Sequence, residues 1–160
     1  MTSKKIILTG SFGVGKTSLF NQFIYQEFSD RYLTTIGAKV NSKVVTTPKG
    51  EVSLLVWDIA GEITQDKVPQ AYFLGTSGIV YVVDLSRPRT FEEVKTDIQF
   101  LKNILPDTVI TIVANKRDLV SDEQLNELAL KMPIPWNILT SAKTGENVEK
   151  MFIDLATQII

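Results

Sequence analysis

The sequence predicts an α/β fold built on a mostly parallel sheet, in one domain spanning residues 1–160. Strand-like apolar runs recur along the chain at residues 6–8, 54–57, 79–83, 109–114 and 136–139. Helical patterns separate most of these runs, and this alternation is typical of α/β proteins. The runs are nearly continuous in apolar residues, which indicates parallel strands buried on both faces. A chain of 160 residues is also long enough to bury one core.

One further strand, over residues 38–47, differs because its residue types alternate. One side carries Val40, Ser42, Val44 and Thr46, and the other carries Lys39, Asn41, Lys43, Val45 and Thr47. This alternation predicts an edge strand with one face toward solvent. The turn sequence Pro-Lys-Gly at 48–50 would fold the strand antiparallel onto residues 54–57.

Two helix starts and two helix faces can be predicted from spacing. Thr90 with Glu93, and Ser121 with Gln124, fit the capping box, in which side chains and backbone N–H groups satisfy each other. Two apolar stripes at helical spacing predict core-facing surfaces: Phe91, Val94, Ile98, Leu101 and Leu105, and Val148, Met151, Phe152, Leu155 and Ile159.

The composition excludes several kinds of chemistry. The chain has 17 basic and 18 acidic residues, so its net charge of −1 provides no electrostatic footprint for nucleic acid. It has no Cys, which excludes disulfides and thiol catalysis, and no His, which excludes Ser-His-Asp chemistry and His-ligated zinc. Hydroxyls, carboxylates, lysines and Mg²⁺ remain for any chemistry.

A cytoplasmic location is expected, because neither a secretory signal nor a membrane-spanning apolar stretch is present. We expect no membrane anchor in these residues, since residue 2 is Thr and the chain lacks Cys for lipidation. The helical pattern still runs at Ile160, which leaves peripheral membrane contact through a tail or a partner open.

Residues Gly10 to Thr17, GSFGVGKT, match the phosphate-binding loop pattern between a predicted strand and a predicted helix. Glycines in such a loop let successive N–H groups converge on a phosphate. Lys16 would reach the β- and γ-phosphates, and Thr17 would give its hydroxyl to Mg²⁺. The expected phosphate contacts are Ser11, Phe12, Gly13, Val14, Gly15, Lys16, Thr17 and Ser18. The alternative is a glycine-rich turn capping an ordinary helix.

Two later segments point to guanine as the base. In Asn115-Lys116-Arg117-Asp118, the Asp118 carboxylate can accept from the N1–H and 2-amino groups of guanine. Adenine would leave Asp118 unpaired, and such sites reject the wrong ligand by factors on the order of 10⁴. Lys116 would lay its stem along the ring, and Asn115 would brace the phosphate loop. The alternative for these four residues is a polar helix-entry turn.

The second base-reading segment is Thr140-Ser141-Ala142-Lys143-Thr144-Gly145. The Ala142 N–H could donate to the guanine carbonyl oxygen, with Ser141 and Lys143 as further expected contacts. Phe28 is placed to pack edge-on against the base, although a core or surface aromatic is an equal alternative.

Three residues between the phosphate loop and the first base-reading segment would sense a third phosphate. Asp58 follows an apolar strand and begins Asp-Ile-Ala-Gly, the position for a carboxylate that holds Mg²⁺ through water. The Gly61 N–H would bond the γ-phosphate. Thr35 could ligate Mg²⁺ by its hydroxyl, although taken alone it belongs to an ordinary threonine pair in a loop.

With these motifs in order, the chain resembles the Ras superfamily of small GTPases over nearly its whole length. Thr35-Ile36-Gly37 and Thr140–Gly145 look most like the Rab branch. The resemblance implies a P-loop NTPase fold: a three-layer α/β/α sandwich with a six-stranded, mostly parallel sheet, one antiparallel edge strand and about five helices. It also implies GTP and GDP binding with Mg²⁺, a monomer, and effectors and regulators that read two loops, 30–38 and 60–72, ordered by the γ-phosphate.

Two residues depart from the family pattern at the hydrolytic machinery, for which the expected catalytic residues are Lys16, Thr35, Gly61 and Glu62. Glu62 stands where the family has a Gln that orients the attacking water. Phe12 replaces a small residue of the phosphate loop, and its ring could obstruct an arginine supplied in trans. We therefore expect slow hydrolysis.

Two other residues could replace the missing glutamine amide and the arginine supplied in trans. Gln65 could supply the amide, although a surface helix residue is the favoured interpretation of Gln65. Arg31 could act as an arginine in cis.

Three functions remain in order of preference: a switch, a GTP-loaded binding module that hardly hydrolyses, and a small-molecule kinase. A kinase would need a cluster of positive residues in a lid over the phosphates, and this chain has no such cluster. The only arginines are Arg31, Arg87, Arg89 and Arg117.

Overall fold

The computed structural model describes residues 1–31, 35–61 and 64–160. Within these ranges one sheet has the strand order β2-β3-β1-β4-β5-β6. The strands are β1 (Thr2–Gly10), β2 (Ala38–Thr47), β3 (Gly50–Ile59), β4 (Thr76–Asp84), β5 (Val109–Asn115) and β6 (Ile138–Leu139). The helices are α1 (Lys16–Tyr25), α2 (Val94–Ile104), α3 (Asp122–Lys131) and α4 (Val148–Ile159). Short 3₁₀ turns are η1 (Gln65–Lys67), η2 (Gln70–Phe73), η3 (Pro88–Phe91) and η4 (Arg117–Leu119).

The predicted edge strand and hairpin are confirmed. β2 pairs antiparallel with β3 along its whole length, from Ala38 opposite Ile59 to Thr47 opposite Gly50, and every other pair in the sheet is parallel. The alternation of β2 separates its faces, because Val45 is buried while Val40 and Val44 are exposed.

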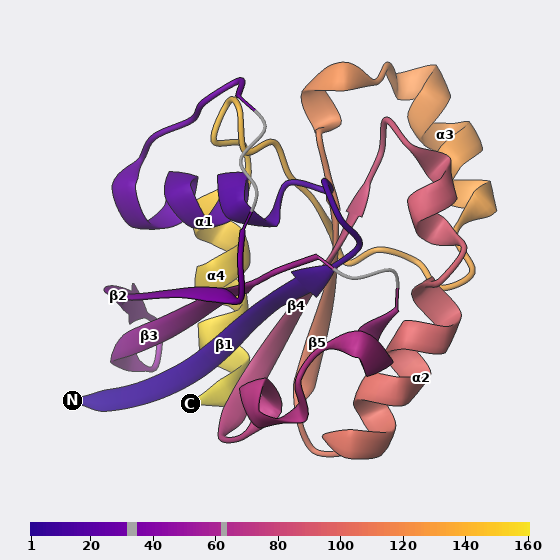
Figure 1. Cartoon of the computed structure of the whole chain (residues 1–160). Coiled ribbons are helices and arrows are strands. Elements are labelled where there is room, and N and C mark those ends of the chain that lie inside the picture. Colours follow the sequence, from indigo (N-terminus) through magenta and orange to yellow (C-terminus); the bar gives the residue numbers. More distant parts are fainter. Residues whose placement is uncertain (32–34, 62–63) are drawn as a thin grey trace.

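Helices cover both faces of the sheet and form two cores (Figure 1). One core lies beneath α1 and α4, where the rings of Phe23 and Phe152 stack with centroids 3.9 Å apart. The other lies beneath α2, α3 and the 3₁₀ turns. Strand β1 serves both cores, since Ile6 packs into the first and Ile7 into the second. This two-sided burial explains the continuous apolar runs of the sequence.

The described residues contain four α-helices, one fewer than the expected count of about five. Between β3 and β4 the described residues form two 3₁₀ turns, separated by Val68 in an extended conformation and by Pro69. Proline lacks the N–H that would continue a helix, so the turns stay short. None of the helices in the described ranges is long and apolar enough to cross a membrane.

One of the two predicted capping boxes is present. The Ser121 side chain accepts from the Gln124 N–H, and the Gln124 side chain accepts from the Ser121 N–H. The box at Thr90 is wrong, because Pro88 starts the turn η3 and α2 begins only at Val94. The Thr90 hydroxyl instead accepts from the Asp84 N–H at 3.0 Å, which ties η3 to the end of β4.

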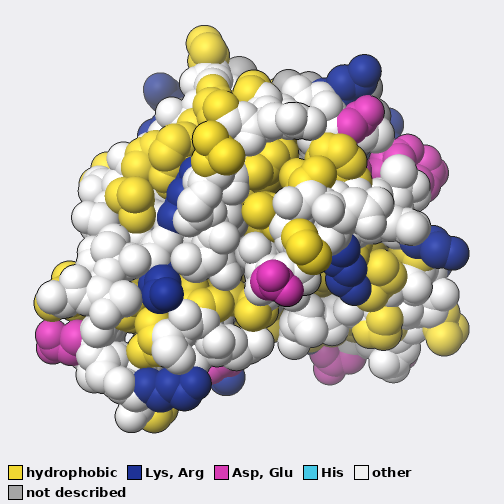
Figure 2. Space-filling view, turned by 90° about the horizontal axis from the view of Figure 1, so that it is seen from below, with side chains coloured by type: hydrophobic (Ala, Val, Ile, Leu, Met, Phe, Trp, Pro, Cys, Tyr) yellow, Lys and Arg dark blue, Asp and Glu magenta, His cyan; other side chains and the backbone are white. Residues whose placement is uncertain are grey.

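The face of the molecule seen from below shows both signs of charge (Figure 2). Lys, Arg, Asp and Glu side chains are scattered among apolar ones there, without one large patch of a single sign. This mixture fits the net charge of −1.

Candidate functional site

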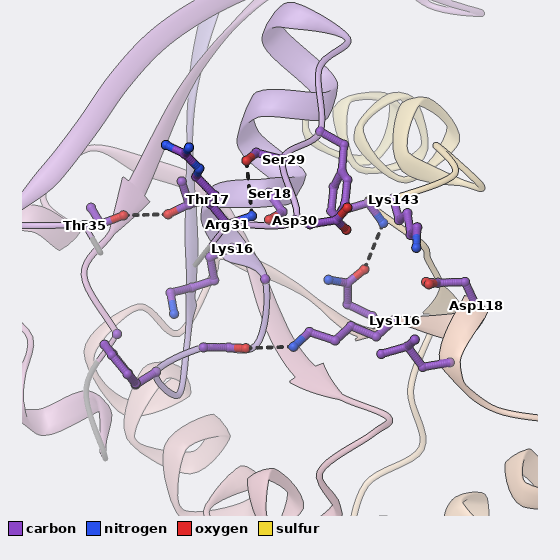
Figure 3. Close-up of a pocket in the computed structure, with 18 of the residues that line it drawn as sticks. Lys16, Thr17, Ser18, Ser29, Asp30, Arg31, Thr35, Lys116, Asp118 and Lys143 are labelled. Carbon is purple, nitrogen blue, oxygen red and sulfur yellow. Dashed lines mark hydrogen bonds between the residues drawn. The ribbon is translucent and has the colours of Figure 1, made fainter. Parts of the chain in front are cut away.

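A cavity of about 320 Å³ lies at the carboxyl end of the sheet, where α/β folds bind ligands (Figure 3). Most of the predicted site residues line it: Phe12, Gly13, Gly15, Lys16, Thr17, Ser18, Phe28, Thr35, Gly61, Asn115, Lys116, Asp118, Ala142 and Lys143. Ser11, Val14, Asp58 and Ser141 are not among the lining residues, and Glu62 lies outside the described residues. The cavity wall also includes Ser29, Asp30, Arg31, Ile59 and Leu119. Arg31 is the arginine that the sequence offered in cis, and Ser29, Ile59 and Leu119 directly follow predicted site residues, which is the signal that could have found them.

The phosphate loop joins the end of β1 to the start of α1 in a conformation that needs glycine. Gly15, the N-cap of α1, has φ 103°, and a Cβ there would lie 2.3 Å from the Asn115 amide nitrogen. A Cβ on Gly10, which has φ 140°, would lie 2.4 Å from the Val82 carbonyl oxygen. The N-cap of α1 supplies no side-chain hydrogen bond and the first turn has no acidic residue. The free N–H groups that a helix N-terminus leaves are therefore suited to accept an anion here.

Lys16 brings a buried positive charge to this loop. Its side chain is 6% exposed, and the ammonium donates to the carbonyl oxygens of Gly10 at 3.2 Å and Ser11 at 2.9 Å. Burial lowers the pKa of Lys16 to about 8, against the attraction of Asp58 and with a small further lowering by Arg87. In the described part of the chain no carboxylate forms a salt bridge with Lys16. An anion in the cavity would restore the favourable environment of this cation.

Three oxygen-bearing side chains from three segments converge beside Lys16. The Thr17 hydroxyl donates to Asp58 Oδ2 at 2.6 Å and lies 2.5 Å from the Thr35 hydroxyl, which in turn donates to the same carboxylate oxygen at 3.2 Å. Asp58 is fully buried, burial raises the pKa of its carboxyl group, and its Oδ1 has no hydrogen-bond partner among the described residues. Hydroxyl and carboxylate oxygens of this kind fit Mg²⁺.

The opposite end of the cavity holds Asp118, whose Oδ1 accepts from the Ser141 hydroxyl at 2.8 Å. Asn115 links this end to the phosphate loop, because its amide donates to the Val14 carbonyl at 3.1 Å. The oxygen of the same amide accepts from the Thr140 hydroxyl at 3.0 Å and from the Ala142 N–H at 3.2 Å. The Ala142 N–H is therefore directed at Asn115 in this structure.

Lys116, which lines the cavity, connects the segment Asn115–Asp118 to the phosphate loop. Its ammonium donates to the Gly13 carbonyl at 3.1 Å and lies 2.9 Å from Asp84 Oδ2. Asp84 is fully buried at the end of β4, opposite Asn115 in the sheet register. Burial alone would raise the pKa of Asp84, but hydrogen bonds from Ser86, Lys116 and Arg87 outweigh burial and lower it. Sequence reasoning missed Asp84, whose signal is a carboxylate that ends a buried strand.

Comparison with known proteins decides the family. The model of the Ras family matches residues 5–160. The chain belongs to the Ras family. It is 35% identical to the Ras-related protein SEC4 of Candida albicans, over 97% of this chain and 76% of that protein. It is 33% identical to the human Ras-related protein Rab-4A, over 98% of this chain and 74% of that protein. It is 34% identical to the Ras-related protein RABA1c of Arabidopsis thaliana, over 97% of this chain and 74% of that protein.

Membership of the Ras family, with relatives of the Rab type, supports a GTP-binding switch with GTP hydrolase chemistry. The fold agrees with this family in its mixed six-stranded sheet with a single antiparallel pair.

One departure of this Ras-family chain from the family pattern lies within the described residues. The Phe12 side chain is 54% exposed at the cavity, and Gly61 lies directly against the Phe12 backbone. A Cβ on Gly61 would stand 2.6 Å from Phe12 Cα and 3.0 Å from the Lys16 ammonium. The second loop therefore packs on the phosphate loop at Phe12, with no room for a side chain at Gly61.

Gln65 has a position that neither interpretation of the sequence foresaw. It is fully buried, so the expectation of a surface helix residue is wrong, and it does not line the cavity, where a substitute amide would be needed. The Thr9 hydroxyl donates to its side-chain oxygen, and its backbone N–H donates to Asp97 Oδ1 at 2.9 Å. The Tyr81 hydroxyl donates to Asp97 Oδ2 at 2.5 Å. We call these four residues, Thr9, Gln65, Tyr81 and Asp97, the buried polar cluster.

Proposed function

We propose that residues 1–160 form one domain that binds GTP and GDP with Mg²⁺ in this cavity and hydrolyses GTP slowly. The observation that carries the proposal is the arrangement of chemistry within one cavity. A helix N-terminus and a buried lysine stand at one end and a carboxylate for base recognition at the other (Figure 3). We propose further that the protein is a monomer and that effectors and regulators read loops 30–38 and 60–72.

The phosphate end suits a nucleotide diphosphate or triphosphate. Loop N–H groups of residues 13–18 and the ammonium of Lys16 would hold the phosphates. Thr17, Thr35 and Asp58 would hold Mg²⁺, and burial of Asp58 with one unpartnered oxygen fits this role. When bound, Mg²⁺ neutralises phosphate charge and orients the terminal phosphate. Thr35 reaches the site from the first loop and Gly61 from the second, so both loops would respond to the third phosphate.

The base end favours guanine over adenine through one carboxylate. Asp118 lines the cavity, and the Ser141 hydroxyl holds its Oδ1. The carboxylate would accept from the N1–H and the 2-amino group of guanine, whereas adenine has no amine at that position. Bound adenine would remove water from the Asp118 carboxylate without giving it a hydrogen-bond donor. This cost makes the site strongly selective for guanine.

Slow hydrolysis is expected from Phe12 and Glu62. The half-exposed Phe12 ring stands at the cavity beside Gly61, where an arginine supplied by an activator would have to approach. Glu62 cannot donate a hydrogen bond to a phosphate oxygen, and its negative charge would repel the phosphates. Nucleotide binding should persist, because the loop that holds the phosphates acts through its backbone.

A second candidate function is a binding module that stays loaded with GTP, and the same two residues favour it. The nucleotide retained by purified protein separates the two functions. A preparation carrying mainly GDP supports the slow switch, and one carrying mainly GTP supports the binding module.

Two measurements test the proposed function directly. Titration with fluorescent GDP, with ADP as competitor, should show tight binding that ADP displaces at least about 10³-fold less well than GDP. Single-turnover hydrolysis should accelerate in Glu62→Gln. Failure to prefer guanine nucleotide would overturn the proposed function, and unchanged or slower turnover in Glu62→Gln would refute the role given to Glu62.

A further inference from the structure

We propose that Arg87 is a positioning residue of the phosphate loop, which holds the peptide between Phe12 and Gly13 so that the Gly13 N–H is directed toward a bound phosphate. This inference rests on the proposed nucleotide binding. It assigns to Arg87 a role that the sequence does not suggest, because Arg87 stands outside all the motifs, in the turn after β4.

Arg87 is held in place by contacts on both its backbone and its side chain. Its N–H donates to the Asp84 carbonyl at 3.0 Å, and its own carbonyl accepts from the N–H and the hydroxyl of Thr90, both at 2.9 Å. The guanidinium donates from Nε to Asp84 Oδ2 at 2.9 Å and from Nη2 to the Phe12 carbonyl at 2.8 Å. Asp84 is fully buried whereas the Arg87 side chain is 32% exposed, so the ion pair is sheltered from water on the carboxylate side.

Two cations therefore hold two consecutive carbonyl groups of the phosphate loop. Arg87 binds the carbonyl of Phe12, and Lys116 binds the carbonyl of Gly13 at 3.1 Å. Both cations contact the same oxygen, Asp84 Oδ2, at 2.9 Å. The buried carboxylate thus places the two donors side by side at the phosphate loop.

Peptide geometry converts these contacts into a prepared anion site. In a planar trans peptide the C=O of one residue and the N–H of the next point in opposite directions. Holding the Phe12 carbonyl against Arg87 turns the Gly13 N–H the other way, and holding the Gly13 carbonyl against Lys116 does the same for the Val14 N–H. Two successive donors are fixed before an anion arrives, which lowers the cost of ordering them on binding.

The loop is shaped to admit Arg87 this closely. Gly13 has φ 76°, and a Cβ on it would lie 3.0 Å from Arg87 Nη2. The guanidinium also adds positive charge behind the loop, and this charge contributes, after burial, to the lowered pKa of Lys16. Both effects favour an anion on the cavity side of the loop.

The test compares GDP with GMP, because GMP lacks the outer phosphate that the N–H groups of the loop would hold. We expect Arg87→Met to weaken GDP binding about 10-fold or more while GMP binding changes less than about 3-fold. Arg87→Lys keeps the charge but cannot bridge Asp84 and Phe12 with a planar fork, so an intermediate loss of about 3-fold for GDP is expected. Arg89→Met, at an exposed arginine two residues further on, is the matched control and should bind both nucleotides as the wild type does.

A spectroscopic measurement adds a readout that a general loss of stability would not produce. In the GDP complex the amide resonances of Gly13 and Val14 report the direction and strength of their hydrogen bonds. We expect both to move in Arg87→Met and to recover in part in Arg87→Lys, while the resonance of Ala142 at the base end stays in place.

Several outcomes would overturn the inference. Equal losses of GDP and GMP affinity in Arg87→Met would show a general structural role, and unchanged GDP affinity would show that Arg87 is dispensable. If Arg87→Met does not fold, Arg87→Lys decides, since an unchanged ratio of GDP to GMP affinity refutes positioning. A preference for GDP over GMP that is the same in the wild type and in Arg87→Met would refute the inference alone, whereas wild-type protein that binds GMP as tightly as GDP, or binds no guanine nucleotide, would refute the proposed function as well.

Discussion

The two loops that border the cavity are attached to the protein in different ways. Among the described residues of the first loop Ile36 is 91% exposed, and the loop is held through the Thr35 hydroxyl and through the Gly37 carbonyl, which accepts from the Ala60 N–H at 2.9 Å. The second loop continues into Gln65, whose side chain is fully buried in the polar cluster with Thr9 and Asp97.

Because of this difference, we expect nucleotide binding to rearrange a longer part of the first loop than of the second. A rearrangement of the first loop breaks the part-buried hydrogen bonds of the Thr35 hydroxyl, but Asp58 Oδ2 keeps the hydrogen bond from Thr17. A rearrangement of the second loop that passes Gln65 must break buried hydrogen bonds, whose donors and acceptors would be left unsatisfied. We expect changes at Gly61 to stop at Gln65, so that the buried polar cluster limits the responsive part of the second loop.

The largest expected effect comes from removing the anchor of the second loop. Asp97→Ala leaves the Gln65 N–H and the Tyr81 hydroxyl without their acceptor in the interior. Two unsatisfied buried donors should lower the free energy of unfolding by about 3 kcal/mol, and amide hydrogen exchange over 65–73 should accelerate. Denaturant unfolding measures the first effect. Asp107→Ala, at an exposed carboxylate, is the control, and equal stability of both variants would refute the anchor.

A smaller effect is expected from the first loop, and on a different quantity. Thr35→Ala removes one hydroxyl of the proposed Mg²⁺ site, so the Mg²⁺ concentration that half-stabilises the complex with a GTP analogue should rise about 10-fold. Stability without ligand should change by less than about 1 kcal/mol, because Asp58 Oδ2 keeps its hydrogen bond from the Thr17 hydroxyl. Thr46→Ala, on the exposed face of β2, is the control. A Mg²⁺ requirement equal to that of the wild type would contradict the role of Thr35.

The pH dependence of stability should give a second test of Asp97, the carboxylate that anchors the second loop. Burial raises the pKa of Asp97, despite hydrogen bonds from Tyr81 and Gln65. The folded state therefore binds this proton more tightly than the unfolded state does, and the stabilising contribution present at low pH is lost as pH rises through the raised pKa. The stability of wild type relative to Asp97→Asn should fall over this range above about pH 4. A difference between the two proteins that does not vary with pH would rule out this linkage.

The smallest effect is expected at the tip of the first loop. Ile36→Ser should change the free energy of unfolding by less than about 0.5 kcal/mol, since this side chain is 91% exposed. Val45→Ser, at a buried valine of β2, should cost several times more in the same denaturation experiment. A loss above about 1 kcal/mol in Ile36→Ser would mean that the first loop is packed as firmly as the second.

Local patterns predicted much of the fold and most of the cavity wall. The edge strand over 38–47 was found with its bounds, because alternation and turn chemistry are properties of neighbouring residues. The phosphate loop and the segment Asn115–Asp118 were found because spacing within a few residues carries their chemistry. The helix start predicted at Thr90 was wrong, because the spacing to Glu93 fits a capping box but Pro88 begins a 3₁₀ turn first.

By itself the sequence determined the order of strands and helices, the phosphate loop and the residue types available for guanine and Mg²⁺, because these follow from short-range periodicity and motif spacing. Only the tertiary structure decided the partners of residues far apart in the chain. It placed Gln65 beneath β1 beside Thr9, and Arg87 behind the phosphate loop at Phe12. Such contacts depend on how strands pair and helices pack, and a polar side chain gives no local sign of whether it ends in water or on a buried partner.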